Sequence, residues 1–467
     1  MDRPVLGSII GKGVYGTVYT KETESGRCVT KKLERSTDGI TRDAARELHA
    51  LFLMKELKDV VRVLKVTFEL TTRGETLISI DFEHYTSDLY KFIETVDFRE
   101  RLASADILIP QLLHGLHALY QRGIIHRDIK PENILVQYQY DTHVNKLIGT
   151  PRCVIADFGL SRQLLCNHQQ DETKMTAAVY SPWYRPPELL IDHQALEKFY
   201  TYNADVWAMG ATIAEYYAGS PLFAVKNYTN GRISEMIKGS LKSDGTTVDL
   251  IPFYKRHLHR HHIKIIPDDA ILQTEKMLTY DWKVRPSIDQ VIDHPILVGK
   301  AMPPLSRGEL KIHDRTYHDL INKMFDHGLK YQLEPVTMIN AIGMLERYLA
   351  NCHPQDEEMI PLVVVITISL SILINEIRAL TMTDYYEMAG QKYSLQVMKE
   401  AQIIIASKLK YCFSSCEVDV FLLMIVDQPK PMAALRNTYL GLMADGYRPQ
   451  MMSYHELAAA VPKYGEK

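Results

Sequence analysis

Two short runs of charged residues constrain this chain more than any other part of its sequence. The first run, HRDIKPEN, covers residues 126–133, and the second, DFG, covers residues 157–159. They bring together groups that can orient a hydroxyl, steady a phosphate and hold a metal ion. Transfer of a phosphoryl group needs little covalent help but much positioning and charge neutralisation. The two runs in this order therefore predict a site for phosphoryl transfer.

Four polar residues in these runs have expected roles in the transfer. Asp128 is the candidate catalytic base, or the group that orients the hydroxyl of a substrate. Lys130 is expected to contact the transferred phosphate. Asn133 and Asp157 are the candidate ligands of Mg²⁺, a cation that prefers oxygen atoms.

A glycine-rich run at residues 11–18 connects two strand-like segments, 5–10 and 14–20, and overlaps the second of them. Glycine lets backbone amides approach phosphates closely because it has no Cβ. The same spacing occurs in dinucleotide-binding proteins, but there a helix follows the loop, whereas a strand follows here. We therefore predict a hairpin that covers a nucleotide. Its candidate binding residues are Gly11, Lys12, Gly13, Val14, Tyr15, Gly16 and Val18.

The lysine that anchors the phosphates should lie on the next strand, at 27–33, where Lys31 and Lys32 are adjacent. Side chains alternate between the two faces of a strand. With Lys31 toward the cleft, the apolar residues Val29 and Leu33 point inward beside it. The residues that then face water are Thr30, Lys32 and Glu34. The opposite register would expose the apolar pair, so we predict that Lys31 is the anchor.

A carboxylate that pairs with Lys31 should lie on the following helix. Residues 43–58 have apolar side chains at 44, 48, 51, 54 and 57, which is the spacing of an amphipathic helix. Glu47 is the best placed acid, and we expect it to hold Lys31 in position. A solvated Glu47 is the alternative.

The remaining pattern predicts an α+β fold of several parts. Residues 5–80 are mainly β-type and residues 87–297 are mainly helical, which predicts a small lobe (about 1–82) and a larger helical lobe (about 83–298). A proline- and glycine-containing segment, 299–311, is expected to be a linker. Residues 312–467 show only helical patterns. The expected helices cover 313–329, 335–350, 360–378, 382–390, 394–411 and 416–426.

Composition narrows the classes of function. A formal net charge of −3 argues against direct binding of nucleic acid. The six cysteines form no disulfide framework or metal motif, which suits a reducing compartment, the nucleus or the cytoplasm. The apolar run at 359–374 is shorter than the ~20 residues that a membrane-spanning helix needs. We therefore expect a buried helix there and no membrane contact.

Residues 1–300 resemble the serine/threonine protein kinases of the cyclin-dependent group. The resemblance rests on GKGVYG, HRDIKPEN, DFGLSR and WYRPPELL, which are spread over the whole segment. It implies a bilobal kinase that uses ATP and Mg²⁺ and acts on serine or threonine residues of protein substrates. Lys130 within HRDIKPEN favours this specificity over specificity for tyrosine. It also implies a gatekeeper at Ile80 and Val29 above the adenine. The hinge that binds the adenine would be Asp81, Phe82 and Glu83.

The same resemblance implies a phosphorylation switch at Thr176, seven residues before Trp183. The arginines expected to bind the phosphate are Arg46, Arg127 and Arg162. An unmodified threonine is the alternative. Tyr15 is the residue of an inhibitory site, although Val14 replaces the neighbouring threonine. The insertion at 137–152 is expected to be a surface loop.

Two further features have no direct part in the predicted chemistry. Glu188 and Arg285 are expected to form a buried ion pair in the large lobe. Histidines at 257, 259, 261 and 262 lie among four cations. A metal site, an anion-binding or docking surface, and a solvated loop all remain open for them.

The tail resembles a cyclin box over roughly residues 310–426, on the patterns at 331–338, 345–350 and 360–377. This implies a cyclin-like helical domain (312–467) that packs on the Glu47 helix within the same molecule. Cyclin boxes carry a lysine at the end of their third helix that contacts the kinase, and this lysine is absent here. Its partner glutamate, expected on the fifth helix, is not matched cleanly, although Glu400 is close to that position. An unrelated helical appendage, a tail that recruits other proteins and a pseudokinase scaffold are the alternatives.

The linker limits how this tail can dock. Fully extended at ~3.3–3.6 Å per residue, it reaches roughly 40–45 Å, so an intramolecular contact needs a nearly straight strap. We expect a monomer. A shorter reach would produce a swapped dimer, in which the tail contacts a second molecule.

Overall fold

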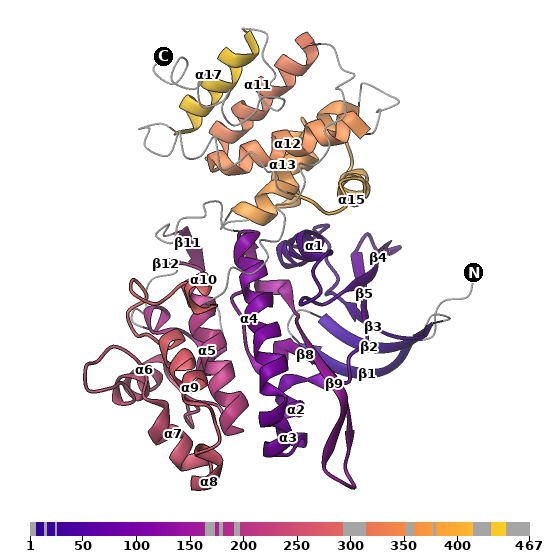
Figure 1. Ribbon diagram of the computed structural model, residues 1–467. Helices are drawn as coiled ribbons and strands as arrows, with labels where there is room; N and C mark the ends of the chain where they lie inside the picture. The colour runs from indigo at the N-terminus through magenta and orange to yellow at the C-terminus, as the bar shows by residue number, and fades with distance from the viewer. Residues whose placement is uncertain are drawn as a thin grey trace.

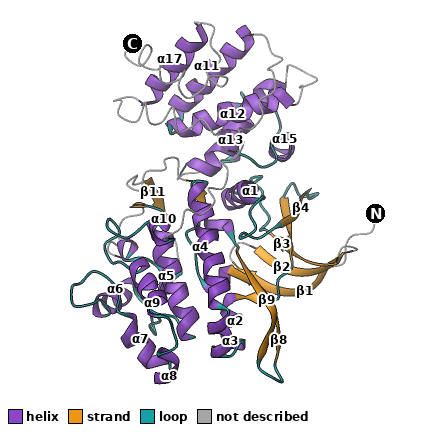
Figure 2. Cartoon of the chain, in the orientation of Figure 1, coloured by secondary structure: helices purple, strands orange, loops and turns teal. Residues whose placement is uncertain are grey.

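The computed structural model describes residues 6–13, 16–23, 26–163, 173–176, 181–190, 197–292, 314–351, 359–376, 380–413 and 431–444. A β-rich small lobe, a helical large lobe and a helical tail follow one another along the chain (Figure 1). Coloured by secondary structure, the molecule concentrates its strands in the small lobe and at its border with the large lobe (Figure 2). The tail lies beside the small lobe, next to α1.

The small lobe is an antiparallel five-stranded sheet with the order β1-β2-β3-β5-β4. Its strands are β1 (Leu6–Gly13), β2 (Gly16–Thr23), β3 (Gly26–Lys32), β4 (Val63–Leu70) and β5 (Thr76–Glu83). The residues on either side of the glycine-rich turn are thus in paired strands, with Gly13 opposite Gly16. This is the expected hairpin.

Helix α1 (Arg42–Met54) covers this sheet at the side of the tail. It begins where the hydroxyl of Thr41 accepts a hydrogen bond from the amide of Ala44 at 3.3 Å. The sequence predicted a helix to residue 58, which is wrong at this end. Leu57 packs on the core from a turn, in which its amide donates to the Met54 carbonyl at 2.8 Å, so the apolar spacing continues beyond the helix.

The large lobe is built around α5 (Asn203–Ala218), all of whose side chains are buried. The other helices described in this lobe are α2 (Leu89–Thr95), α3 (Phe98–Ala103), α4 (Ala105–Gln121), α6 (Asn230–Gly239), α7 (Leu250–His257), α8 (Arg260–Ile263), α9 (Asp268–Met277) and α10 (Ile288–Val291). Of these, α3, α4, α7 and α9 pack against α5. The guanidinium of Arg285 donates to both carboxylate oxygens of Glu188, at 2.8 and 2.9 Å. This confirms the predicted buried ion pair.

The expected surface loop at 137–152 is wrong, because these residues form a long β-hairpin. Strands β8 (Ile134–Asp141) and β9 (Lys146–Ile155) pair beyond the lobe, and β6 (Ser87–Asp88) adds a third strand. Tyr138, Tyr140 and Leu147 pack against the core, which fixes their strands. The period-two alternation of tyrosine and polar residues is the signal for this hairpin.

Helix α13 (Ile360–Asn375) forms the centre of the tail. From Leu362 to Ile374 every side chain is buried, as expected for this apolar run. Around it lie α11 (Asp314–Lys330), α12 (Pro335–Asn351), α14 (Met382–Met388), α15 (Leu395–Lys408) and α17 (Pro431–Ala444). The helix expected at 416–426 lies outside the described residues. Within the described ranges, no helix combines the length and apolar character needed to cross a membrane.

Candidate active site

A cavity of about 570 Å³ lies between the two lobes. Both lobes contribute side chains to its wall. The lining residues are Ile10, Gly11, Lys12, Gly16, Val18, Val29, Lys31, Glu47, Val61, Phe82, Glu83, Tyr85, Lys130, Glu132, Asn133, Leu135, Ala156 and Asp157. A cleft of this size, with a glycine-containing edge and charged groups at one end, suits a nucleotide.

Not all predicted nucleotide-binding residues line this cavity. Val14 and Tyr15 lie outside the described residues. Gly13 ends β1, opposite Gly16. Ile80 is fully buried, opposite Lys31 in the β3–β5 pair.

Asp81 points away from the cavity, toward the other face of the sheet. Its carboxylate accepts hydrogen bonds from Lys21 Nζ and from the hydroxyl of Thr30, both at 2.6 Å. Thr30 is therefore buried, and the prediction that it faces water is wrong. A carboxylate on the adjacent strand supplies the partner that makes burial of this hydroxyl favourable.

Lys31, rather than Lys32, reaches the charged end of the cavity. Its Nζ donates to Glu47 Oε1 at 2.7 Å and to Asp157 Oδ1 at 2.8 Å. Burial alone would lower the pKa of Lys31, but the two carboxylates outweigh it and raise that pKa above its usual value. Burial likewise tends to raise the pKa of Asp157, and the charge of Lys31 lowers it below its usual range. The three residues therefore form a charged network that joins β3, α1 and the DFG run.

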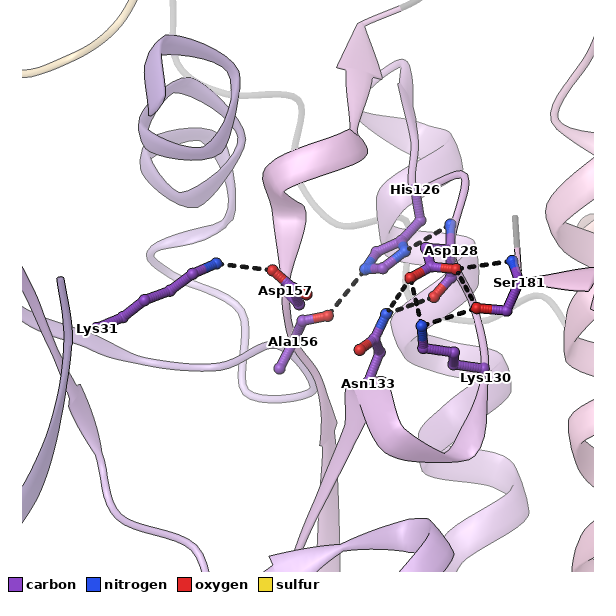
Figure 3. Close-up of polar contacts among 8 residues, drawn as sticks. All are labelled: Lys31, His126, Asp128, Lys130, Asn133, Ala156, Asp157 and Ser181. Atoms are coloured by element: carbon purple, nitrogen blue, oxygen red, sulfur yellow. Dashed lines mark hydrogen bonds and ion pairs between the residues drawn. The ribbon is translucent and has the colours of Figure 1, made fainter. Parts of the chain in front are cut away.

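Asp128 lies at the opposite side of the site in a dense set of hydrogen bonds (Figure 3). One carboxylate oxygen accepts from Lys130 Nζ and from Asn133 Nδ2, both at 2.8 Å. The other accepts from the backbone amide and the hydroxyl of Ser181, both at 3.0 Å. These four bonds hold the carboxylate in one orientation.

Ser181 is a site residue that the sequence reading missed. Its hydroxyl donates to Asp128 and also accepts a hydrogen bond from Lys130 Nζ at 2.8 Å, so it connects the two (Figure 3). Ser181 lies two residues before Trp183, in the segment that follows Thr176. A lone serine in such a segment gives no pattern that distinguishes it from its neighbours.

Asp205 in α5 holds the loop that carries Asp128. The carboxylate of Asp205 accepts the backbone amides of His126 at 2.6 Å and Arg127 at 3.0 Å. Arg127 has a φ of 69°, a left-handed conformation that is unfavourable for any residue other than glycine. His126 Nε2 bonds the carbonyl of Ala156 at 2.9 Å, which ties this loop to the DFG run. The strained loop is therefore held by at least two elements.

The residues present fit a Mg²⁺-bound nucleotide. Mg²⁺ usually takes only one or two protein oxygens and completes its shell with phosphates and water. The Nδ2 group of Asn133 is engaged by Asp128, so its carboxamide oxygen is the atom that would bind a metal. The carboxylate of Asp157 is the second such group. No cluster of three or more acidic, histidine or cysteine side chains that would hold a metal without a nucleotide occurs in the described parts of the chain.

The three predicted phosphate-binding arginines lie together at the edge of the site. Burial and then the charges of Arg162 and Arg127 hold the pKa of Arg46 well below its usual value. Arg46 donates to the Glu376 carbonyl at 3.3 Å, and Arg162 donates to the carbonyl of Asn375, both at the end of α13. Thr176 ends strand β11 (Thr173–Thr176), and its side chain lies outside the described part.

The histidine-rich segment is a surface feature of α7 and α8. His259, His261 and His262 contact one another through their rings, and His262 stacks on Phe98 at 4.2 Å. Nothing in the described residues completes a metal site there. The docking-surface and solvated interpretations both stay open.

Comparison with known proteins agrees with this geometry. The family model described as "Protein kinase domain" matches residues 5–297. Cyclin-dependent kinase B2-1 of Oryza sativa is 29% identical over 61% of this chain and 87% of its own length. Mitogen-activated protein kinase 4 of Arabidopsis thaliana is 29% identical over 74% of this chain and 87% of its length.

A solved structure is also similar, the crystal structure of the yeast RNA Pol II CTD kinase CTDK-1 complex. One chain of it aligns with a TM-score of 0.46 and 20% identity, over 63% of this chain and 92% of its own. The family match covers more than half of the present chain and includes every charged group described above. The chain therefore belongs to the protein kinase family, as a serine/threonine protein kinase that uses ATP.

Proposed function

We propose that this chain is a cyclin-dependent-type kinase whose own tail acts as a cyclin-like activator in the same molecule. The observation that carries this proposal is the contact between the tail and α1, the helix that brings Glu47 to Lys31. The substrates would be serine and threonine hydroxyls of proteins. MgATP, when bound, would supply the phosphoryl group.

The proposed chemistry uses the groups already described. Asp128 would orient the substrate hydroxyl and accept its proton, since its carboxylate is fixed by Lys130, Asn133 and Ser181. Lys130 would neutralise charge on the phosphate in transfer. Lys31 would orient the phosphates, and Asn133 and Asp157 would hold the metal.

The tail contacts the small lobe at several separate places. The backbone amide of Ile40, just before α1, donates to Gln402 Oε1 at 2.8 Å. Lys399 Nζ donates to the Gly74 carbonyl, in the β4–β5 turn, at 3.0 Å. The ring of Tyr411 stacks on Phe68 of β4, with centroids 5.6 Å apart. These contacts support a tail that fixes α1 against the sheet.

The tail helices also support a cyclin-like interpretation. Five of the six expected helices are present near their predicted positions, and the apolar α13 packs against α1. The backbone carbonyls at the end of α13 accept from Arg46 and Arg162. Backbone carbonyls thus make contacts where the absent lysine of the resemblance was expected.

A single-residue change can test activation by the tail in the complete chain. Gly39 has a φ of 81°, and a Cβ there would collide with the carboxamide of Gln402. Gly39→Ala should therefore loosen the docking. Gly149→Ala is the matched control, because Gly149 has a φ of 72° but nothing within 4 Å of an added Cβ.

We expect Gly39→Ala to lower kcat about tenfold or more and to speed amide exchange in α1, with Gly149→Ala near wild type. Faster exchange with unchanged kcat would favour a tail that recruits other proteins. Unchanged exchange and kcat in Gly39→Ala would overturn the intramolecular activation. Absence of phosphoryl transfer by the wild-type chain would support the pseudokinase alternative.

A further inference from the structure

The imidazole of His49 lies where three parts of the molecule meet: α1, the tail, and the start of the segment between the DFG run and Trp183, which contains Thr176 and is called the activation segment below. His49 is two residues after Glu47 on α1 and is almost fully buried. Its Nε2 is 3.0 Å from Gln163 Oε1, and its Nδ1 is 3.2 Å from the backbone nitrogen of Phe413. The ring of Phe413 also stacks on it, with centroids 6.1 Å apart. One side chain therefore contacts all three elements.

The partners determine the protonation state of this imidazole. A backbone N–H can only donate, so Nδ1 must accept the bond from Phe413 and carry no proton. The proton is then on Nε2, where it donates to the carboxamide oxygen of Gln163. Burial lowers the pKa of His49 to about 4, so the ring stays neutral at ordinary pH. Both polar atoms of the neutral ring are used.

Gln163 connects this junction to the catalytic loop. It lies in β10 (Arg162–Gln163), four residues after the DFG run, where Gln163 pairs with Ile124 and Arg162 pairs with Ile125. Strand β7 (Ile124–Ile125) leads directly into His126. A displacement of Gln163 would therefore pull on the strand pair next to the loop of Asp128.

The tail presents Phe413 from an unusual turn at the end of α15. Lys410 and Tyr411 have φ values of 52° and 61°, both left-handed. Such a conformation is unfavourable for residues other than glycine and persists where the surroundings require it. Here Arg347 donates to the Cys412 carbonyl at 2.9 Å, and Tyr411 stacks on Phe68. The strain indicates that this turn is shaped for its contact with the kinase.

We propose that His49 is a positioning residue that transmits docking of the tail to the activation segment through its bonds to Phe413 and Gln163. This inference rests on the proposed function, and it adds a second path by which the tail acts on the kinase. Through α13 and Gln402 the tail fixes α1. Through His49 the same tail fixes the start of the activation segment and the strand that precedes His126.

The side chain of Gln163 gives the safest test, because it is only partly buried. Gln163→Leu removes the acceptor for Nε2–H, whereas Gln163→Glu retains one and is the matched control. His49→Phe keeps a ring that can stack on Phe413 but loses both bonds. The complete chain should be assayed at pH 8, with kcat and the KM for ATP measured separately.

We expect Gln163→Leu and His49→Phe each to lower kcat about tenfold, with the KM for ATP within about twofold, because Lys31 and Glu47 keep their places. Gln163→Glu should retain most of the activity. The double variant should be no worse than either single one, since both remove the same bond. Exchange in α1 should stay slow in Gln163→Leu.

Three results would overturn the inference: wild-type kcat in Gln163→Leu, an equal loss in Gln163→Glu, or losses that add in the double variant. If Gly39→Ala is impaired while Gln163→Leu is not, only the route through His49 fails. If neither variant is impaired, the proposed activation by the tail fails as well.

Discussion

Among single residues, Lys31 compensates two carboxylates at once. Without it, Glu47 and Asp157 would face each other without a cation between them. We expect Lys31→Met to reduce phosphoryl transfer on the order of 10³-fold while the fold remains intact, because a charge-stabilising group is lost. Lys32→Met is the control, since Lys32 lies over the ring of Tyr19. A radioactive phosphate-transfer assay on both variants, with circular dichroism, distinguishes loss of chemistry from loss of fold.

Glu215 gives a prediction about pH. Burial raises its pKa from 4.5 to about 7, and its carboxylate accepts from the Tyr184 hydroxyl at 2.6 Å. A raised folded-state pKa contributes stability below about pH 4.5, and this contribution is lost as the pH rises through about 7. Glu215→Gln, which has no charge to bury, should therefore gain stability relative to wild type on going from pH 5 to pH 8, by up to ~3 kcal/mol. Denaturant melts at the two pH values measure the difference, and an equal difference at both would contradict it.

The sequence predicted residue positions well where a period or a motif applies. Strand alternation selected Lys31, and the two charged runs led to Asp128 and Asp157. It failed for Thr30, whose burial depends on a carboxylate supplied by another strand. It also missed Ser181, because only folding brings that hydroxyl to Asp128.

At the scale of elements, the activation segment and its arginines give the next prediction. Phosphate on Thr176 would bring about two negative charges to Arg46, Arg127 and Arg162, whose positive charges repel one another. We expect Thr176→Ala to lower activity by about tenfold or more. Thr173→Ala, in the same strand, is the control. Intact-mass spectrometry of the active protein identifies the modified form.

Wild-type activity in Thr176→Ala would contradict this switch, and the tail would then set the active state by itself. Loss of all three arginines should make the modification irrelevant, because an unpaired phosphate cannot order the segment.

Element boundaries were less predictable than element types. Helix α1 ends at Met54 although its apolar spacing runs to Leu57, because a turn can bury the same face. The hairpin of β8 and β9 was expected to be a loop, since short alternating segments resemble irregular ones when they have few apolar residues. The tail helices were predictable because their apolar pattern extends over long segments. Their docking on the small lobe depends on contacts that sequence spacing does not encode.

For the whole molecule, we predict a monomer. The linker lies outside the described residues, and its extended reach is roughly 40–45 Å. A tether of this kind gives an effective concentration on the order of millimolar, which favours docking within one molecule. Light scattering should give 53.6 kDa over a wide range of protein concentration. Activity per molecule should also be independent of dilution, whereas a swapped dimer would show twice the mass and lose activity on dilution.

The contacts of Gln402 and Phe413 with the small lobe have one more consequence, which concerns turnover. An activator made as a separate protein can be degraded while its enzyme survives, so synthesis and proteolysis can produce pulses of activity. If this tail activates α1 as proposed, destroying the activator means destroying the kinase with it. Rapid, reversible control would then have to act through covalent modification, substrate supply or compartment, and the lifetime of the polypeptide would set the longest duration of its signal.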